Sequence, residues 1–255
     1  MQLLMWVPFV FALSVLVYAA VLDFRKREVS NRLWCFAYPI GCAMTLGGLG
    51  FGLFDVGAVL VSVLVCVFLG VGLVWSGFYG GADIKALLFI ALSAPTIPLA
   101  LSPALNVPSL PLVLTVFCNS TLLSLIWPLS IFSLNLKDTL KGNRLFEDLP
   151  LALPQKIRLF FTTRRTTIEK MEGLRYFPSE QIEVQNGQPT RKFLRVMKAE
   201  TDLTKCYNEL NTYKHLYKEG VLASPTIPTI LFFAVAFGVA PLGNLFFWAV
   251  TLLVM

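Results

Sequence analysis

The sequence predicts an all-α polytopic membrane protein of about six transmembrane helices, with a small cytosolic α+β segment between the fifth and the sixth. Composition is the first reason: 56% of the 255 residues are hydrophobic and only 14% are charged, whereas soluble proteins carry about a quarter charged residues. The mean hydropathy is +0.70. The second reason is that charge-free stretches of span length recur along the chain. This composition excludes intrinsic disorder, a disulfide-stapled secreted module and, despite a net charge of +6, a nucleic-acid-binding domain.

Uncharged stretches place the individual spans, because a helix needs roughly 20 mainly apolar residues to cross the hydrocarbon layer. Residues 1–22, 33–54 and 56–82 carry no charged side chain, and each stretch is about one span long. The uncharged stretch 86–136 is long enough for a fourth and a fifth span, with a break at its prolines. Residues 227–254 supply the sixth span.

The first uncharged stretch is predicted to be a retained span rather than a secretory signal peptide. No basic residue precedes it, no clear small-residue cleavage site ends it, and the basic residues follow it. All 21 Lys and Arg residues fall in the first, third and fifth connections between spans. Because positively charged loops face the cytosol, these connections are predicted to be cytosolic and both termini are predicted to lie outside.

Charge and hydropathy divide the chain into three predicted parts. Residues 1–136 form a five-helix membrane portion that carries both candidate aspartates, residues 137–224 form a soluble cytosolic segment, and residues 225–255 form the sixth transmembrane helix. The cytosolic segment holds 16 basic and 11 acidic residues. Its basic excess reflects membrane topology or attraction to anionic lipid rather than a nucleic-acid site.

The cytosolic segment has the pattern of an α+β structure. Residues 181–184 and 191–196 are predicted strands, and the Asn-Gly pair between them indicates a hairpin turn. Residues 198–218 have the apolar spacing of an amphipathic helix.

No motif indicates metal or nucleophile chemistry. The five cysteines include no Cys-x-x-Cys pair and His215 is the only histidine, so neither a zinc site nor a two-histidine metalloprotease is expected. The sequence also lacks the phosphate loop Gly-x-x-x-x-Gly-Lys and the nucleophile elbow Gly-x-Ser-x-Gly. We therefore expect no metal and no other cofactor, which leaves carboxylates as the candidate reactive groups.

Two aspartates at predicted span ends are the strongest candidates for catalysis. Asp23 directly follows the first span and Asp83 begins the fourth, so the predicted topology places both on the cytosolic side at a similar depth. Two neighbouring carboxyls in a poorly solvated site do not both ionise easily. One can then take a proton from an attacking water while the other polarises the substrate carbonyl, which is the chemistry of an aspartic protease. The alternative is that both charges only cap or solvate helix ends.

Gly80 and Gly81 precede Asp83 and fit this chemistry. They carry no side chain and permit positive φ angles, so a substrate backbone can approach Asp83 closely. We expect them to form the supporting loop of the site; the alternative is an ordinary turn between two spans.

The two aspartate motifs resemble those of a known family. The segment 23–31, DFRKREVSN, has the order of aspartate, basic stretch, aliphatic residue, small residue and asparagine. This order resembles that of the membrane-embedded aspartic peptidases that process type IV prepilins, especially the archaeal preflagellin (prearchaellin) peptidases. The segment 80–85, GGADIK, is similar to the Gly-x-x-Asp-x-Lys form of their GxGD motif, with Ala82 in place of the second glycine. The resemblance covers residues 1–135 well and the last span loosely, and it does not extend to 138–224.

This resemblance implies that Asp23 and Asp83 are the catalytic pair of an aspartic endopeptidase. The implied substrates are membrane-inserted preflagellin or prepilin-like precursors, whose short basic leader is removed on the cytosolic side just before a hydrophobic helix. The implied location is an archaeal cell membrane. Bacterial relatives commonly add an N-methyltransferase domain with paired Cys-x-x-Cys motifs, and this chain has neither those motifs nor room for that domain, so peptidase activity alone is expected. The expected partners are precursors and lipid, and no nucleic acid.

Polar residues near the two motifs have roles that stay open. Lys85 anchors its loop or tunes Asp83, or is one more positive-inside charge. Asn31 pins the loop that holds Asp23, or only forms a turn. Acidic residues of the cytosolic segment either attract the basic leader of a substrate or belong to an ordinary solvated surface; they are Glu180, Glu183 and Asp202.

Two other classes of function stay open, a small proton-coupled transporter and a non-catalytic membrane scaffold. Transporters often show related halves and ionisable groups near the bilayer midplane, and the sequence has neither a clear internal repeat nor such a position. A scaffold tolerates replacement of both aspartates by asparagine, whereas a peptidase loses activity with either replacement.

Overall fold

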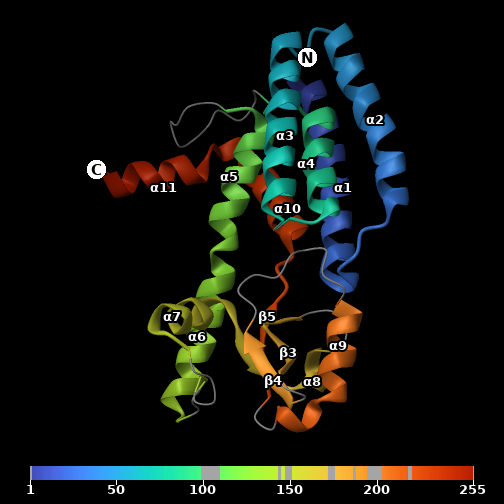
Figure 1. The fold of residues 1–255 in the computed structure, drawn as a ribbon. Coiled ribbons are helices and arrows are strands. Elements are labelled where there is room, and N and C mark those ends of the chain that lie inside the picture. Colours follow the sequence, from blue (N-terminus) through green and yellow to red (C-terminus); the bar gives the residue numbers. More distant parts are fainter. Residues whose placement is uncertain are drawn as a thin grey trace. The chain divides into compact units, whose positions relative to one another are not determined.

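The chain forms two compact units (Figure 1). Residues 1–124 and 228–255 form the first, called here the helical unit, and residues 125–227 form the second, the α+β unit. The structure is a computed structural model that describes residues 2–77, 79–98, 110–142, 145–146, 151–171, 176–185, 188–193, 203–217 and 220–254.

The basic loop that carries the first motif joins α1 (Gln2–Lys26) to α2 (Asn31–Gly50). α1 continues through the uncharged residues and ends at the basic ones, where Arg27 takes a positive φ of 55°. Ser30 then caps α2, because its side chain accepts a hydrogen bond from the backbone N–H of Arg32. The connection is short, so it keeps the end of α1 close to the beginning of α2.

α3 (Val56–Ser76) and α4 (Gly81–Ser93) form the next pair of helices. Asp55 caps α3 by accepting a hydrogen bond of 2.9 Å from the backbone N–H of Ala58. Gly77 ends α3 with a φ of 68°, a left-handed conformation that a residue without a Cβ adopts at little cost. α4 begins four residues later, at Gly81.

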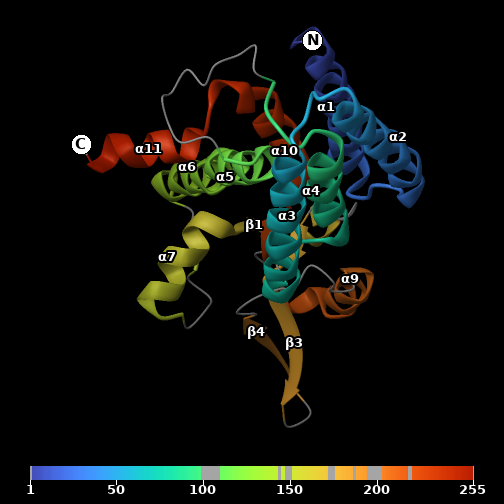
Figure 2. The same ribbon diagram turned by 90° about the horizontal axis from the view of Figure 1, so that it is seen from above.

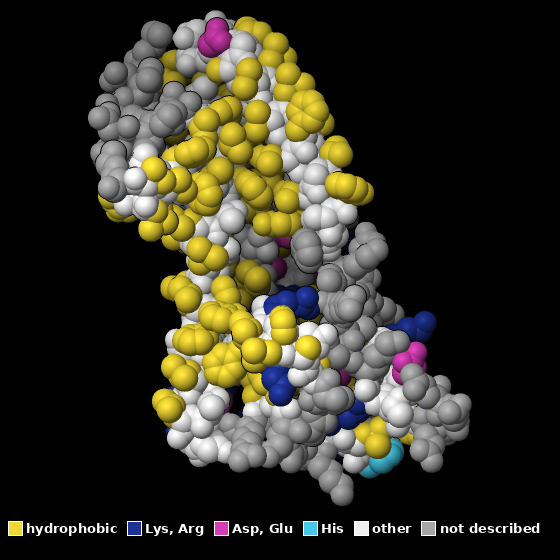
Figure 3. Space-filling model, turned by 60° about the vertical axis from the view of Figure 1, so that its left-hand side comes forward, with side chains coloured by type: hydrophobic (Ala, Val, Ile, Leu, Met, Phe, Trp, Pro, Cys, Tyr) yellow, Lys and Arg dark blue, Asp and Glu magenta, His cyan; other side chains and the backbone are white. Residues whose placement is uncertain are grey.

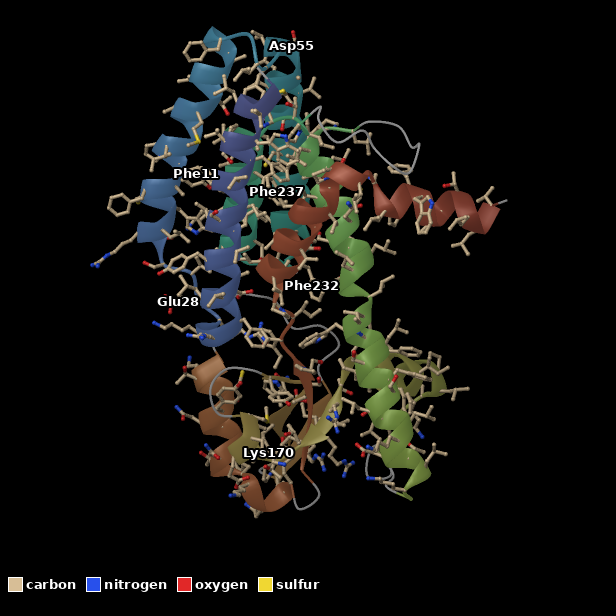
Figure 4. The ribbon with its side chains drawn as sticks, turned by 180° about the vertical axis from the view of Figure 1, so that it is seen from behind. Phe11, Glu28, Asp55, Lys170, Phe232 and Phe237 are labelled. Atoms are coloured by element: carbon tan, nitrogen blue, oxygen red, sulfur yellow. The ribbon has the colours of Figure 1, made fainter. Side chains whose placement is uncertain are left out.

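The core of the helical unit is built around α10 (Thr229–Val239), which packs against α1, α4 and α5 (Leu112–Ser124). Figure 2 shows α10 next to α4 and α5. The ring of Phe237 stacks on Phe9 of α1 with 4.5 Å between the ring centroids, and Figure 4 shows Phe237 beside α1. A segment from the end of the chain therefore holds together helices from its beginning.

The last helices are sharply bent. A 3₁₀ turn (Ala240–Leu242) connects α10 to α11 (Leu245–Val254), and the two helices differ in direction by 69°. Buried Asn119 of α5 bridges the break: its Nδ2 donates to the Gly243 carbonyl at 3.1 Å and its Oδ1 accepts from the Leu245 N–H at 2.7 Å. Because unpaired backbone groups are costly in a membrane, Asn119 allows the helix to break there.

Four helices of the described part are long and apolar enough to cross a membrane. They are α1, α2, α3 and the stretch Leu112–Leu140, which comprises α5 and α6 (Ile126–Leu140). α10 and α11 make a fifth if the bent pair is one span. The predicted number of six is not confirmed. α4 has 13 residues and is about 20 Å long, which is shorter than a hydrocarbon core of about 30 Å.

Hydrophobic side chains cover much of the described surface of the helical unit (Figure 3). Several large apolar residues are strongly exposed, among them Phe36, Phe68 and Trp75, the last at 93% of its surface. Water disfavours such a surface and lipid does not, so the exposure agrees with the membrane prediction.

The α+β unit contains a three-stranded antiparallel sheet in the order β1-β5-β2, and a separate hairpin of β3 and β4. In the sheet, β5 (Val221–Pro225) pairs with both short neighbours, and in the hairpin Glu180 lies opposite Phe193. The other elements are α6 (Ile126–Leu140), β1 (Arg164–Thr166), β2 (Tyr176–Pro178), β3 (Glu180–Gln185), β4 (Gln188–Phe193), α7 (Leu153–Thr162), α8 (Ile168–Met171), α9 (Leu203–Thr212) and a 3₁₀ turn (Lys214–Leu216).

The predicted hairpin is confirmed in the described residues, where both strands begin within three residues of those expected; residues 194–196 of the second predicted strand lie outside the described part. Its turn, 186–187, lies outside the described residues. The predicted helix 198–218 is confirmed in part as α9, which ends at Thr212 before the 3₁₀ turn, while residues 198–202 lie outside the described part. The division at 136 and 224 into membrane and cytosolic parts stays a prediction.

Candidate active site

Asp23 lies in the last turn of α1, where its carboxylate meets the beginning of α10. The backbone of Ile230, in the first turn of α10, forms a hydrogen bond with this carboxylate. The first N–H groups of a helix have no partner within the helix, so they favour an anion at this place. The Oδ2 atom of Asp23 is shielded from solvent and has no hydrogen-bond partner among the described residues. The carboxylate is thus bonded to a backbone group of α10, while its Oδ2 atom has no hydrogen-bond partner among the described residues.

Asp83 occupies the first turn of α4. Its Oδ2 accepts a hydrogen bond of 3.0 Å from the backbone N–H of Gly80, which fixes the side chain over the start of its own helix. A Cβ on Gly81 would have no heavy atom within 4 Å, and a Cβ on Gly80 would lie 3.7 Å from Asp83 Oδ2. A side chain at Gly80 would therefore approach the carboxylate, whereas the position of Gly81 faces open space.

Gly80 and Gly81 do not use the positive φ angles that glycine permits. Gly80 is extended, with φ −80° and ψ 163°, and Gly81 is helical. Gly77 takes the positive φ instead, because the reversal of direction occurs at the end of α3. Absence of a side chain, rather than unusual backbone, is what the two motif glycines provide.

The fold places the two aspartates within electrostatic range of each other, since the charge of Asp23 is one of those that act on Asp83. Asp55 belongs to the opposite end of the helices: Figure 4 shows it far from Glu28, which follows α1 in the loop of the first motif. Asp23 and Asp83 thus meet at one end of the helical unit, and Asp55 lies at the other.

A hydrogen bond connects the two motifs directly. Lys85 Nζ, on α4, donates to Asn31 Oδ1, at the first residue of α2, over 2.7 Å. The hydroxyl of Tyr38, also on α2, donates to the backbone carbonyl of Lys85 at 2.8 Å. Lys85 is therefore bound to α2 by both its side chain and its backbone, and Asn31 bonds to the second motif rather than within its own loop.

Sequence reasoning missed Tyr38 and Ile230. Tyr38 gave one usable signal, since a tyrosine hydroxyl inside an apolar span needs a hydrogen-bond partner. Ile230 gave none, because its contribution is a backbone N–H that only the packing of α10 against α1 brings to Asp23.

Glu180 does not fit either role expected of it. Its side chain is buried and accepts hydrogen bonds from Arg191 Nε at 2.7 Å and from the backbone N–H of Leu222 at 2.8 Å. It therefore connects the hairpin to β5 and is neither a solvated surface charge nor a group open to a substrate leader. Glu183 is half-buried on β3, and Asp202 lies outside the described residues.

Groups that hold metals are not found together in the described part of the chain, where no three His, Cys, Asp or Glu residues form a cluster. The cysteines are free thiols and include Cys66, which is buried on α3. The groups described at the candidate site are two carboxylates and the backbone N–H groups bonded to them.

Comparison with known families gives one match. Residues 10–129 match the sequence model of the type IV leader peptidase family. The matched range includes both motifs, 23–31 and 80–85, and ends within α6. None of the curated proteins compared with the chain matches it.

Proposed function

We propose, from the match of residues 10–129 to the sequence model of the type IV leader peptidase family, that the protein is an aspartic endopeptidase whose catalytic groups are Asp23 and Asp83. It removes the short basic leader from membrane-inserted preflagellin or prepilin-like precursors at the cytosolic face. The observation that carries the proposal is the electrostatic interaction of these two aspartates, which come from different helices of the matched range.

The two carboxyls act as one unit with one shared proton. The ionised carboxylate takes a proton from a water whose oxygen attacks the carbonyl carbon of the scissile peptide. The protonated carboxyl donates a hydrogen bond to the carbonyl oxygen, which accepts negative charge as the tetrahedral intermediate forms. When the C–N bond breaks, a proton passes to the leaving amine, and the pair again holds one proton.

Backbone N–H groups suit this cycle, because they hold each aspartate without supplying a proton. The Ile230 N–H holds Asp23 and the Gly80 N–H holds Asp83. Asp23 Oδ2, which has no partner among the described residues, is the oxygen we assign to the attacking water. Open space at Gly81 admits the extended backbone of the scissile segment.

Lys85 and Asn31 are positioning residues in this proposal. Their hydrogen bond holds the beginning of α4 against the beginning of α2, and thereby sets where Asp83 lies relative to Asp23. Tyr38 supports the same contact through the Lys85 carbonyl. The protein is a multi-pass protein of an archaeal membrane with peptidase activity alone, and both termini lie outside.

The test is cleavage of a membrane-inserted prepilin-like precursor by the purified full-length protein. Asp23→Asn and Asp83→Asn are expected to abolish the product, whose new N-terminus is read by mass spectrometry. Asp55→Asn is the matched control, because it removes the same charge at the far end of α3 and asparagine caps a helix as well as aspartate does.

Each outcome of this test either supports or rejects the proposed function. Loss of cleavage in the first two variants, with cleavage kept in Asp55→Asn and normal thermal unfolding in all three, supports the catalytic pair. Cleavage by both Asp23→Asn and Asp83→Asn rejects it. Failure of the unmodified protein to cut any of several precursors rejects the peptidase and leaves the transporter and the scaffold.

A further inference from the structure

An apolar groove runs along the helical unit between α3 and α4. Its volume is about 520 Å³, within the range of sites that hold small ligands or a few side chains. The lining consists almost entirely of carbon, and the residues used below are Val67, Gly70, Val71 and Val74 of α3 with Ile84 and Leu88 of α4.

The groove begins at the level of the candidate active site. Ile84 directly follows Asp83 and forms part of the groove wall, and Trp75 lies at the nearby end of α3. From there the groove continues toward Cys66 on α3 and Leu88 on α4. The rise of 1.5 Å per residue makes it about 13 Å long on the α3 side, or two and a half helical turns.

Gly70 gives the groove its depth. A Cβ at this position would lie 3.5 Å from Ile84 Cγ2, so the missing side chain leaves a channel between the two helices. Small residues of this kind let another helix backbone approach closely in a membrane. Val71 and Val74, exposed at 65% and 63%, form the outer wall on the same side of α3.

The chemistry of the lining limits what the groove can hold. It offers almost no polar group, so an extended peptide would leave its backbone N–H and C=O groups unpaired. A helix satisfies its own backbone and presents only side chains. Among peptide segments the lining therefore favours an apolar helix, and the position of Ile84 next to Asp83 would place the beginning of that helix close to the scissile bond.

We infer that this groove binds the first two to three turns of the hydrophobic helix that follows the cleavage site of a precursor; this inference rests on the proposed function. The substrate is extended at the open space beside Asp83 and helical from there on, with one face of the helix against Gly70, Val71 and Val74. The groove thus selects precursors by the size of the apolar side chains on that face.

A matched pair of glycine variants tests the inference. Gly70→Leu fills the groove, whereas Gly72→Leu adds the same side chain to the same helix at an exposed position with no heavy atom within 4 Å. Two membrane-inserted precursors are compared, one with Leu and Phe in the first two turns after the cut and one with Ala at those positions. kcat and KM are measured for both with full-length protein.

Gly70→Leu is expected to lower kcat/KM for the bulky precursor roughly tenfold or more, mainly through KM, and to change it much less for the alanine precursor. Gly72→Leu is expected to leave both unchanged. Equal losses for the two precursors, or none, overturn the inference while cleavage by the unmodified protein keeps the proposed function. Failure of the unmodified protein to cleave overturns both.

Photo-crosslinking provides a test that does not depend on how Gly70→Leu folds. A photoreactive side chain at Val71, in the groove, is compared with one at Phe68, which is also exposed on α3 but does not line the groove. Crosslinks from position 71 to the first turns of the precursor helix, absent from position 68, support the inference. Crosslinks from position 71 to lipid alone overturn it, because the groove then holds acyl chains.

Discussion

Lys85 and Asn31, which are 54 residues apart in sequence, are joined side chain to side chain over 2.7 Å and thereby connect the two aspartate motifs. Lys85 lies two residues after Asp83, and Asn31 is the last residue of the motif 23–31, which begins with Asp23. The bond joins α4, which carries Asp83, to α2, so it restrains Asp83 through its own helix and Asp23 through the short connection between α1 and α2.

Loss of this bond is expected to affect the chemical step more than binding. Lys85→Met or Asn31→Leu is expected to lower kcat roughly ten- to hundredfold with little change in KM, because a misplacement of about 1 Å at reacting groups has effects of this size. The two effects are expected not to add in the double variant, since both remove one contact. Steady-state kinetics of precursor cleavage gives kcat and KM for each single variant and for the double variant.

Two variants separate positioning from general damage. Asn31→Asp keeps an acceptor for Lys85 and is expected to keep most of the activity. Lys26→Met removes another lysine, exposed at the end of α1, and is expected to be neutral. An Asn31→Asp variant as slow as Asn31→Leu would show that the bond has no positioning role.

Tyr38→Phe removes the hydroxyl that donates to the Lys85 carbonyl. A lost hydrogen bond of this kind is expected to lower the free energy of unfolding by about 1 kcal/mol and to slow cleavage several-fold. Tyr18→Phe, on the exposed face of α1, is the control. Thermal unfolding in detergent and kcat are measured for both, and equal behaviour of the two variants contradicts the expectation.

Asn119→Leu removes both hydrogen bonds across the break between α10 and α11. The Gly243 carbonyl and the Leu245 N–H are then unpaired, and we expect a loss of roughly 1–3 kcal/mol in the free energy of unfolding. Thr121→Val, at an exposed position on the same helix, is expected to have little effect. Denaturation midpoints of the two variants in the same detergent make the comparison, and a midpoint unchanged by Asn119→Leu would refute the bridging role.

The burial of Glu180 predicts that the stability of the α+β unit depends on pH. Burial raises the pKa of this carboxyl, and the Leu222 N–H and Arg191 offset only part of that effect. The pKa of a glutamate in the unfolded chain is about 4.3. Because the folded state holds the proton more strongly, the Glu180 contribution to stability is fully present below that pH and is lost as pH rises through the higher folded pKa.

Hydrogen exchange of the Leu222 amide, measured against pH in the full-length protein, checks this sign. Protection is expected to fall with rising pH through that window, and the fall is expected to disappear in Glu180→Gln. Glu209→Gln, at an exposed position of α9, is expected to keep it. Protection that rises with pH in the unmodified protein would reverse the sign and reject the argument.

Much of the helical unit was predictable because apolar length alone determines where a membrane helix lies. The uncharged stretches 1–22, 33–54 and 56–82 correspond to α1, α2 and α3. α4 was predicted too long, because uncharged residues continue past Ser93, whereas the helix ends before the Ala94-Pro95 pair. Charge patterns report where a helix can lie but not where it stops.

The sheet of the α+β unit was not predictable from local pattern. β1 and β2 have three residues each and pair with β5, which comes about 45 to 60 residues later in the chain. Strands that short have no recognisable period, and their pairing depends on long-range packing. The β3–β4 hairpin was predictable because its turn and both of its strands are adjacent in sequence.

The bond between Asp23 and the beginning of α10 has a consequence for the order in which the protein becomes active. α10 begins after residue 228, beyond the range that matches the family and beyond the whole α+β unit. A growing chain that has delivered every helix up to α5 to the membrane still leaves Asp23 without the Ile230 N–H. Under the proposed function, leader removal is therefore expected only after α10 has been made, and a ribosome that stalls within residues 125–227 is expected to leave a chain in which Asp23 lacks this hydrogen bond.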